Sequence, residues 1–158
     1  MTEQRESIPP CLIRIDKEGC WHHQGIEMIH REFIRLFYQN MELDSKGRYL
    51  INWGHTRCYV DVEDTAFVVT RVSLERGSDR KPSRFEVSLS DDTQEALAPD
   101  TLRVGKDHVL YCTVKSDSFP ARFARAAYYQ LAEFIEEDDR GYFLPLNGQR
   151  HYIAISHS

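Results

Sequence analysis

Apolar positions repeat at about 3.6 residues in two stretches of the chain and alternate with polar positions in most of the rest. The first helical stretch predicts a helix over 26–42, ended by a turn at Gly47. Residues at this spacing share one side of a helix, so we expect its apolar row to face the core. The row consists of Ile26, Ile29, Phe33, Leu36 and Phe37.

A second helical stretch lies near the end of the chain. Its pattern predicts a helix over 119–137 that Ser118 could cap. Pro120 restricts the residue before it to an extended shape, so the regular helix should begin at the proline. The expected buried row consists of Phe119, Phe123, Ala127, Leu131 and Phe134.

The remaining apolar residues predict strands bounded by turn-forming residues. Two helices among many strands indicate an α+β fold with a mixed, largely antiparallel sheet. The predicted strands are 11–15, 48–52, 57–63, 66–75, 84–90 and 108–114, followed by a hairpin over 142–156.

Two short stretches suggest that one folding unit occurs twice. Residues 47–54 read GRYLINWG and residues 141–148 read GYFLPLNG. Aligning them brings the preceding F-x-R-x-x-Y motifs of residues 33–38 and 123–128 into register. Chance is the alternative, but the preserved spacings favour an internal duplication of a helix–hairpin unit. We therefore predict an N-terminal unit over 11–65, a C-terminal unit over 66–158 and a flexible tail over 1–10.

Composition narrows the possible functions. The 158 residues are 41% hydrophobic and carry a net charge of −5, with a pI near 5.8. Without a basic run, a general nucleic-acid binder is not expected. No stretch is apolar enough for a signal peptide or a membrane span, which predicts a cytoplasmic protein with reduced thiols. The four cysteines, expected to be small apolar core residues, are Cys11, Cys20, Cys58 and Cys112.

Several motifs together resemble a bacterial family catalogued as domain of unknown function 1285. They are I-x-x-x-G-x-W at 15–21, RLF at 35–37, D-x-x-G-x-Y at 44–49, V-E-D-x-x-F at 62–67 and A-R-F-x-R-x-x-Y-Y at 121–129. The resemblance extends over about residues 12–156, nearly the whole chain.

The resemblance implies a duplicated α+β fold with one half similar to a pleckstrin-homology domain. It also implies a ligand site between the halves, for a nucleotide-like molecule, and a link to signalling, with no established enzyme activity. The sequence departs from the family pattern at 26–27 and at 52–56.

The residues best suited to a ligand site are the arginines and tyrosines of the two predicted helices. Paired guanidinium groups suit a phosphate or a carboxylate, and tyrosine rings can stack on a ligand. Acidic residues at the end of the 57–63 strand would organise the arginines. The alternative is that the arginines only pair with Asp61, Glu63 and Asp64, or are solvated. The candidate ligand-binding residues are Arg35, Tyr38, Arg122, Arg125, Tyr128, Asp61 and Asp64.

The sequence holds no standard metal-binding spacing and no catalytic motif, so we predict no metal site, no cofactor and no catalytic residue. The preferred hypothesis is a non-catalytic, signalling-related protein that binds a small anionic or nucleotide-like ligand where the two repeats meet. The alternative is a protein-interaction or self-association module, such as a homodimer, since many strands imply exposed sheet edges. A hydrolase with a site assembled in space is the third hypothesis.

Overall fold

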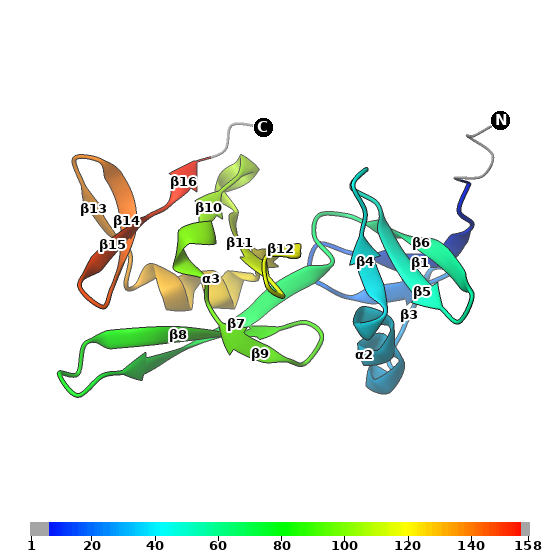
Figure 1. Ribbon diagram of the computed structural model, residues 1–158, viewed down its shortest axis with the longest axis horizontal. Helices are drawn as coiled ribbons and strands as arrows, with labels where there is room; N and C mark the ends of the chain where they lie inside the picture. Colours follow the sequence, from blue (N-terminus) through cyan, green and yellow to red (C-terminus); the bar gives the residue numbers. More distant parts are fainter. Residues whose placement is uncertain (1–6, 156–158) are drawn as a thin grey trace. The chain divides into compact units, whose positions relative to one another are not determined.

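A computed structural model of the chain describes residues 7–155. The chain divides into two compact units after Ala66, called unit 1 and unit 2 below (Figure 1). Residues 1–6 of the predicted tail lie outside the described residues. Pro10, also assigned to that tail, instead begins the first strand of unit 1, and the carbonyl of Pro9 accepts a hydrogen bond from the Tyr59 amide.

Unit 1 is a sheet with one α-helix. The strand order is β3-β2-β1-β6-β5-β4, in which β1 and β6 are parallel and the other neighbours are antiparallel. The strands are β1 (Pro10–Ile15), β2 (Trp21–His23), β3 (Ile26–Glu27), β4 (Met41–Leu43), β5 (Tyr49–Trp53) and β6 (Thr56–Val62), and the helix is α2 (Arg31–Gln39).

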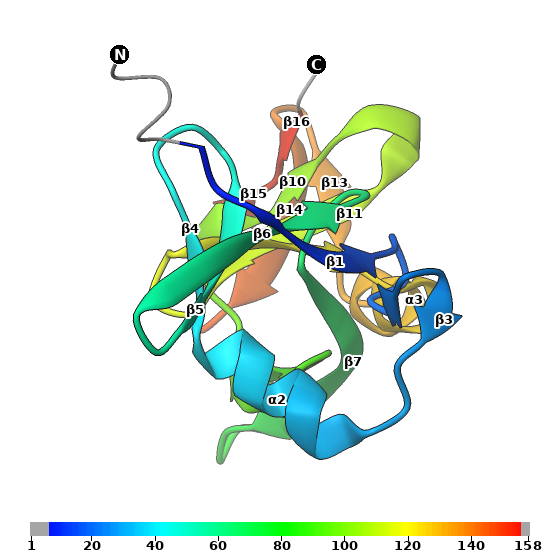
Figure 2. The same cartoon turned by 90° about the vertical axis from the view of Figure 1, so that its right-hand side faces the viewer.

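The register of the central strands separates an apolar side of the sheet from a polar side. Ile15 is paired with Trp21 and Val62, whereas Arg14 is paired with His22 and Asp61. Successive residues point to opposite sides, so the apolar set and the charged set cannot share a face. Helix α2 lies on one side of these strands (Figure 2), and its Phe37 and Tyr38 rings contact Trp21, which marks the apolar side as the core.

The helix predicted over 26–42 is shorter than expected, and its predicted apolar row was wrong. Residues 26–27 form the edge strand β3, and α2 buries Ile34 and Tyr38 instead. Of the predicted row, Ile29 and Phe33 stay largely exposed, with 74% and 51%, whereas Phe37 is half-buried and stacks on Trp21. The helix has two apolar sides, and the sheet covers the one that carries Ile34.

A disulfide joins Cys11 to Cys58 across the parallel pair of β1 and β6, with Cα atoms 5.0 Å apart. The prediction that all four thiols are reduced was therefore wrong for these two, while Cys20 and Cys112 are free. The disulfide lies where the register of β1 shifts between Pro10 and Arg14, next to Leu12 with a φ of 65°.

Unit 2 contains a larger sheet, a small sheet and the second α-helix. Among the described residues the larger sheet has the order β16-β10-β11-β12-β7-β8-β9, and the small sheet has the order β13-β14-β15. The elements are β7 (Phe67–Arg76), β8 (Pro82–Leu89), β9 (Gln94–Ala96), η1 (Pro99–Thr101), β10 (Arg103–Val104), η2 (Lys106–His108), β11 (Leu110–Val114), β12 (Phe119–Phe123), α3 (Arg125–Ala132), β13 (Glu136–Asp138), β14 (Gly141–Leu146), β15 (Gln149–Tyr152) and β16 (Ala154–Ile155).

The helix predicted over 119–137 is a strand followed by a shorter helix. Phe119–Phe123 is β12, which lies between β11 and β7, and only Arg125–Ala132 is helical. Phe119 and Phe123 are buried as expected, because a spacing of four residues fits both strand and helix periods. Pro120 is tolerated because pairing with β7 begins only at Ala121.

Each α-helix is followed by three antiparallel strands: α2 by β4, β5 and β6, and α3 by β13, β14 and β15. In the first hairpin Leu50 is paired with Tyr59, and in the second Phe143 is paired with Tyr152. Aligning the two hairpins by these pairs matches Leu50 with Phe143. The alignment by the flanking glycines matches Leu50 with Leu144, so the two alignments differ by one residue.

Candidate functional sites in the two units

The predicted arginines of unit 2 lie at the turn from β12 into α3. Arg122 is half-buried near the end of the strand, and Arg125 is the exposed first residue of the helix. The first turn of α3 holds no acidic residue, and no side chain caps it. The amide groups and the dipole at this helix end add positive potential to that of the guanidinium groups. The turn is therefore suited to a small anion.

Two tyrosines extend from the same helix. The predicted Tyr128 is 36% exposed, and its ring packs edge-to-face on that of Tyr129 with centroids 5.4 Å apart. Tyr129 is the more exposed of the two. These rings, one helical turn beyond Arg125, could stack on a planar ligand.

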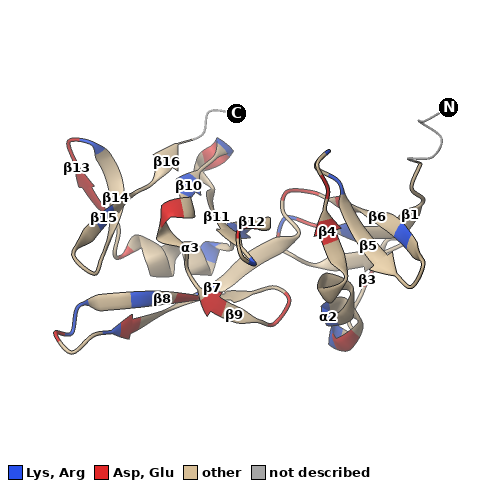
Figure 3. Ribbon diagram, viewed as in Figure 1, with Lys and Arg blue, Asp and Glu red and all other residues tan. Residues whose placement is uncertain are grey.

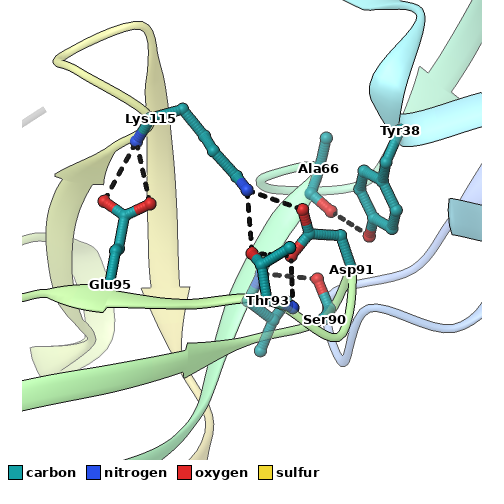
Figure 4. A network of polar contacts seen from close by, with 8 residues as sticks. Tyr38, Ala66, Ser90, Asp91, Thr93, Glu95 and Lys115 are labelled. Carbon is teal, nitrogen blue, oxygen red and sulfur yellow. Dashed lines mark hydrogen bonds and ion pairs between the residues drawn. The ribbon is translucent and has the colours of Figure 1, made fainter.

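The predicted residues on the helix of unit 1 have different environments. Arg35 is exposed on α2, whereas Tyr38 is only 4% exposed. The Tyr38 hydroxyl donates a hydrogen bond of 2.7 Å to the carbonyl of Ala66 (Figure 4). The structure thus places Tyr38 in the core of unit 1 with its hydroxyl hydrogen-bonded, whereas the sequence prediction expected it to face a ligand.

Both predicted aspartates line a pocket that lies within unit 1 and has a volume of about 560 Å³. Asp61 is exposed near the end of β6, and Asp64 follows the strand and is half-buried. This volume is within the range of small-ligand sites, roughly 300–1,000 Å³. The sequence identified the aspartates but not their neighbours here, which include Ile8, Arg48, Tyr49 and Tyr59.

Charged side chains of both signs line this pocket, which we call the aspartate pocket, namely Asp61, Asp64 and Arg48. The guanidinium of Arg48 donates to Asp44 at 2.7 Å, so one positive group is matched by a carboxylate outside the lining. The backbone amide and the guanidinium of Arg48 lower the pKa of Asp44. Burial, with a further contribution from the Asp64 charge, raises the pKa of the Tyr49 hydroxyl. The lowered pKa of Asp44 reflects its hydrogen-bond donors, and the raised pKa of Tyr49 reflects mainly its burial.

A second pocket of about 330 Å³ lies beside the first on the polar side of the sheet, and Asp61 lines both. Arg14 and His22 line the second pocket and stand in register with Asp61 across the strands. Nearby, a ring nitrogen of His22 lies 3.0 Å from the carboxylate of Asp16. Neither Arg14 nor His22 was predicted to line a site.

Unit 2 contains a polar cluster that the sequence did not suggest (Figure 4). The Lys115 ammonium lies 2.7 Å from the buried carboxylate of Asp91 and donates to the Thr93 hydroxyl at 2.8 Å. The Lys115 amide donates to Glu95 at 3.1 Å. A lysine ammonium can donate three hydrogen bonds, and a buried carboxylate such as that of Asp91 is costly without a partner. The cluster therefore has a structural role at the β11–β12 turn.

Charged residues of both signs are distributed over both units (Figure 3). Within residues 7–155, no group of three or more His, Cys, Asp or Glu side chains is arranged to hold a metal ion. In the same part of the chain, no helix has the length and apolar character needed to cross a bilayer.

The indole N–H of the buried Trp21 has no hydrogen-bond partner among the described residues.

Comparison with known proteins identifies the fold. No family model matches the sequence, and no curated protein matches it. The elements form an α+β fold of mixed sheets with two α-helices. Its solved relatives in structure are DUF1285 family proteins, so the chain has a DUF1285-type fold.

Two such structures were compared with this chain. A DUF1285 family protein from Silicibacter pomeroyi DSS-3 is 20% identical with a TM-score of 0.76, covering 90% of this chain and 79% of its own. A DUF1285 family protein from Shewanella baltica OS155 is 21% identical with a TM-score of 0.62, covering 77% of this chain and 91% of its own.

Proposed function

We propose that this chain is a non-catalytic, signalling-related protein that binds a small anionic or nucleotide-like ligand. The observation that carries the proposal is the β12–α3 turn, where two arginines adjoin an uncapped helix N-terminus. Arg125 is exposed there, and the neighbouring Tyr128 offers a ring face for a base or another planar group.

The proposal includes an internal duplication, in which Arg35 and Arg125 are equivalent positions of the two repeats. The shared order of a helix and three antiparallel strands supports it, as does the matching of Tyr59 with Tyr152 in the two hairpins. The seven-stranded sheet with one α-helix in unit 2 supports a pleckstrin-homology-like half.

Thermal shift with a panel of nucleotides and organic anions tests the proposal. A true ligand should raise the melting temperature of the wild type, and Arg125→Ala should abolish that rise because the charge-assisted hydrogen bonds are lost. Arg35→Ala tests the equivalent position of unit 1, and Arg80→Ala, in an exposed loop, is the matched control. If every anion that stabilises the wild type raises the melting temperatures of Arg125→Ala and Arg35→Ala by the same amount, the proposal fails.

A second candidate function, protein interaction or self-association, is favoured by the exposed apolar residues of unit 1. The exposed apolar residues are Ile29 just before α2, Phe33 on α2 and Trp53 at the end of β5. Large exposed apolar patches are uncommon outside interaction sites. Light scattering over a range of concentrations tests self-association. A mass that rises with concentration in the wild type and not in Phe33→Ser would support it, whereas a constant monomer mass would contradict it.

A further inference from the structure

We propose that the chain forms a weak symmetric dimer in which helix α2 of one copy packs antiparallel on helix α2 of a second copy. The proposal rests on the second candidate function, self-association, and assigns its surface and its symmetry. It is independent of the anionic ligand, which is carried by the β12–α3 turn of unit 2 and tested through Arg125→Ala.

The outer side of α2 carries apolar side chains that the chain leaves in water. With about 3.6 residues per turn, Phe33 and Leu36 lie one turn apart, on the side of the helix away from the buried Ile34. Figure 2 shows α2 on one side of the strands, so its other side faces away from them. We call the exposed set the α2 patch. Its members are Ile29, Phe33, Leu36 and Trp53, which are 74%, 51%, 36% and 50% exposed.

Ring contacts fix the shape of the α2 patch. The half-buried Phe37, one turn after Phe33, stacks on Trp21 with ring centroids 6.1 Å apart. The same ring meets Trp53 edge-on at 5.6 Å, and the His30 ring meets Phe33 edge-on at 6.1 Å. Side chains that are already held in position lose little conformational freedom on association, so the patch is preorganised.

The spacing of the patch selects a helix as its occupant. Side chains three and four residues apart form a ridge that fits the groove of another helix. In the described part of the chain, the other α-helix has no such exposed row, because Leu131 of α3 is buried and its exposed rings, Tyr128 and Tyr129, are consecutive. A helix that fits the patch is therefore available as α2 of a second copy.

A twofold axis makes the row complementary to itself. In an antiparallel pair centred between Phe33 and Leu36, each Phe33 faces Leu36 of the second copy. A large ring against a smaller side chain fills the contact better than Phe33 against Phe33, which a parallel pair would give. Antiparallel helices also place the opposite ends of their dipoles side by side, which adds a small attraction.

The exposed area is enough for a weak dimer. A fully exposed large apolar side chain has about 200 Å² of surface, so the exposed fractions give the α2 patch about 400 Å². Two copies would bury about 800 Å² of it, and exposed polar side chains at the edge, such as Glu32 and Gln39, bring the total to about 1,000 Å². A specific interface needs at least this area, which suits a Kd on the order of 10–100 μM.

Sedimentation velocity of the full chain between about 5 and 500 μM measures the dimer. The wild type should change from monomer to dimer over this range. Phe33→Glu should raise the dimer Kd at least about tenfold, because association would bury an unpaired charge. Tyr142→Glu makes the same kind of change at a ring of unit 2 that is 51% exposed, and its Kd should stay within about twofold of the wild type.

A charge exchange tests the antiparallel arrangement. Phe33→Glu and Leu36→Lys should each be monomeric alone, since each would bury two unpaired charges in its dimer. In an equal mixture, the new glutamate of one copy faces the new lysine of the other, while the remaining Leu36 and Phe33 still meet. The mixture should therefore form a heterodimer at concentrations at which neither variant associates.

Three outcomes overturn the proposal, and they are distinguishable. A constant monomer mass up to 500 μM would contradict both the α2 pair and self-association in general. Equal association of Phe33→Glu and the wild type would leave self-association standing and exclude the α2 patch as its surface. A mixture that stays monomeric would exclude the antiparallel pair. None of these outcomes bears on the anionic ligand.

Discussion

Helix α2 of unit 1 and helix α3 of unit 2 have nine and eight residues, but their apolar side chains have different fates. In α3, Ala127 and Leu131 are completely buried, and the side chain of Gln130 accepts a hydrogen bond of 2.7 Å from the Val72 amide of β7. In unit 1, by contrast, Ile29 just before α2 and Phe33 on α2 are exposed. A helical apolar period therefore does not by itself identify the side of a helix that is covered.

The two units also differ in how they are held together. Unit 1 carries the Cys11–Cys58 disulfide, which links residues 47 positions apart, while the described free cysteine of unit 2, Cys112, is a buried apolar side chain. Burial raises the pKa of the Cys112 thiol to about 12. Since small units bury a lower fraction of their surface, a cross-link adds relatively more to their stability. Unit 1 should therefore depend on its disulfide, and unit 2 on its core.

Removing the disulfide gives the largest expected effect. The Cys11→Ser, Cys58→Ser double variant should destabilise unit 1 by about 4 kcal/mol, because the reduced chain regains the loop entropy of the closed segment. Hydrogen exchange on the full chain should show faster exchange for the amides of β5 and β6 than in the wild type. Cys20→Ser, which removes a half-buried free thiol, is the matched control. Equal loss of protection in β7 and β8 would break the comparison between the units.

Truncating the covered side of α3 tests the other half of the comparison. Leu131→Ala should cost about 3 kcal/mol of unfolding free energy, since the leucine is completely buried and leaves a cavity. Phe33→Ala removes a larger side chain from α2, yet it should cost less than about 1 kcal/mol because the ring is half-exposed. Denaturant titrations of both variants measure the difference. Similar losses would show that the exposed row of α2 is covered in solution.

A β-branched composition at 66–75 and alternation of apolar and polar residues at 84–90 were sufficient to predict the long strands. The strands expected at 66–75 and 84–90 are observed as Phe67–Arg76 and Pro82–Leu89. The three-residue strand β4 was included in the predicted helix, because three residues are too few to show a period. Pro120 favoured a helix start, and only the pairing with β7 shows that a strand can accommodate it.

The candidate sites were predicted less completely than the strands. Arg122 and Arg125 lie on either side of the β12–α3 turn, and Asp61 and Asp64 line one pocket, but their assignment to a ligand site stays a prediction. The burial of Tyr38 was not predicted, because amphipathic spacing does not reveal that its hydroxyl reaches a backbone carbonyl. The disulfide was also missed, because its cysteines meet only through a parallel strand pairing between distant segments.

A smaller effect is expected at the turn of unit 2 between β11 and β12. Lys115, Ser116 and Asp117 all have positive φ, and Ser116 has a φ of 56°. A non-glycine residue is disfavoured in this conformation, so Ser116→Gly should stabilise the protein by about 0.5–1 kcal/mol after the entropy cost of glycine. Denaturant unfolding measures it, with Ser78→Gly, in another exposed loop, as the control. Destabilisation by Ser116→Gly would show that its side chain has a role of its own.

The smallest effect concerns acid stability at the β1–β2 turn of unit 1. Burial alone would raise the pKa of Asp16, but hydrogen bonds with His22 and with the amides of Cys20 and Glu18 lower it below 3.8. A carboxylate with a lowered pKa in the folded state stabilises the protein above its unfolded pKa, and this contribution disappears as the pH falls below about 4. Asp16→Asn should therefore be less stable than the wild type at pH 6, and the difference should narrow toward pH 3. Urea midpoints across this pH range measure it, with Asp79→Asn as a control because Asp79 lies in an exposed loop of unit 2. A difference between the wild type and Asp16→Asn that stays constant with pH would show that the ionised carboxylate does not stabilise this turn.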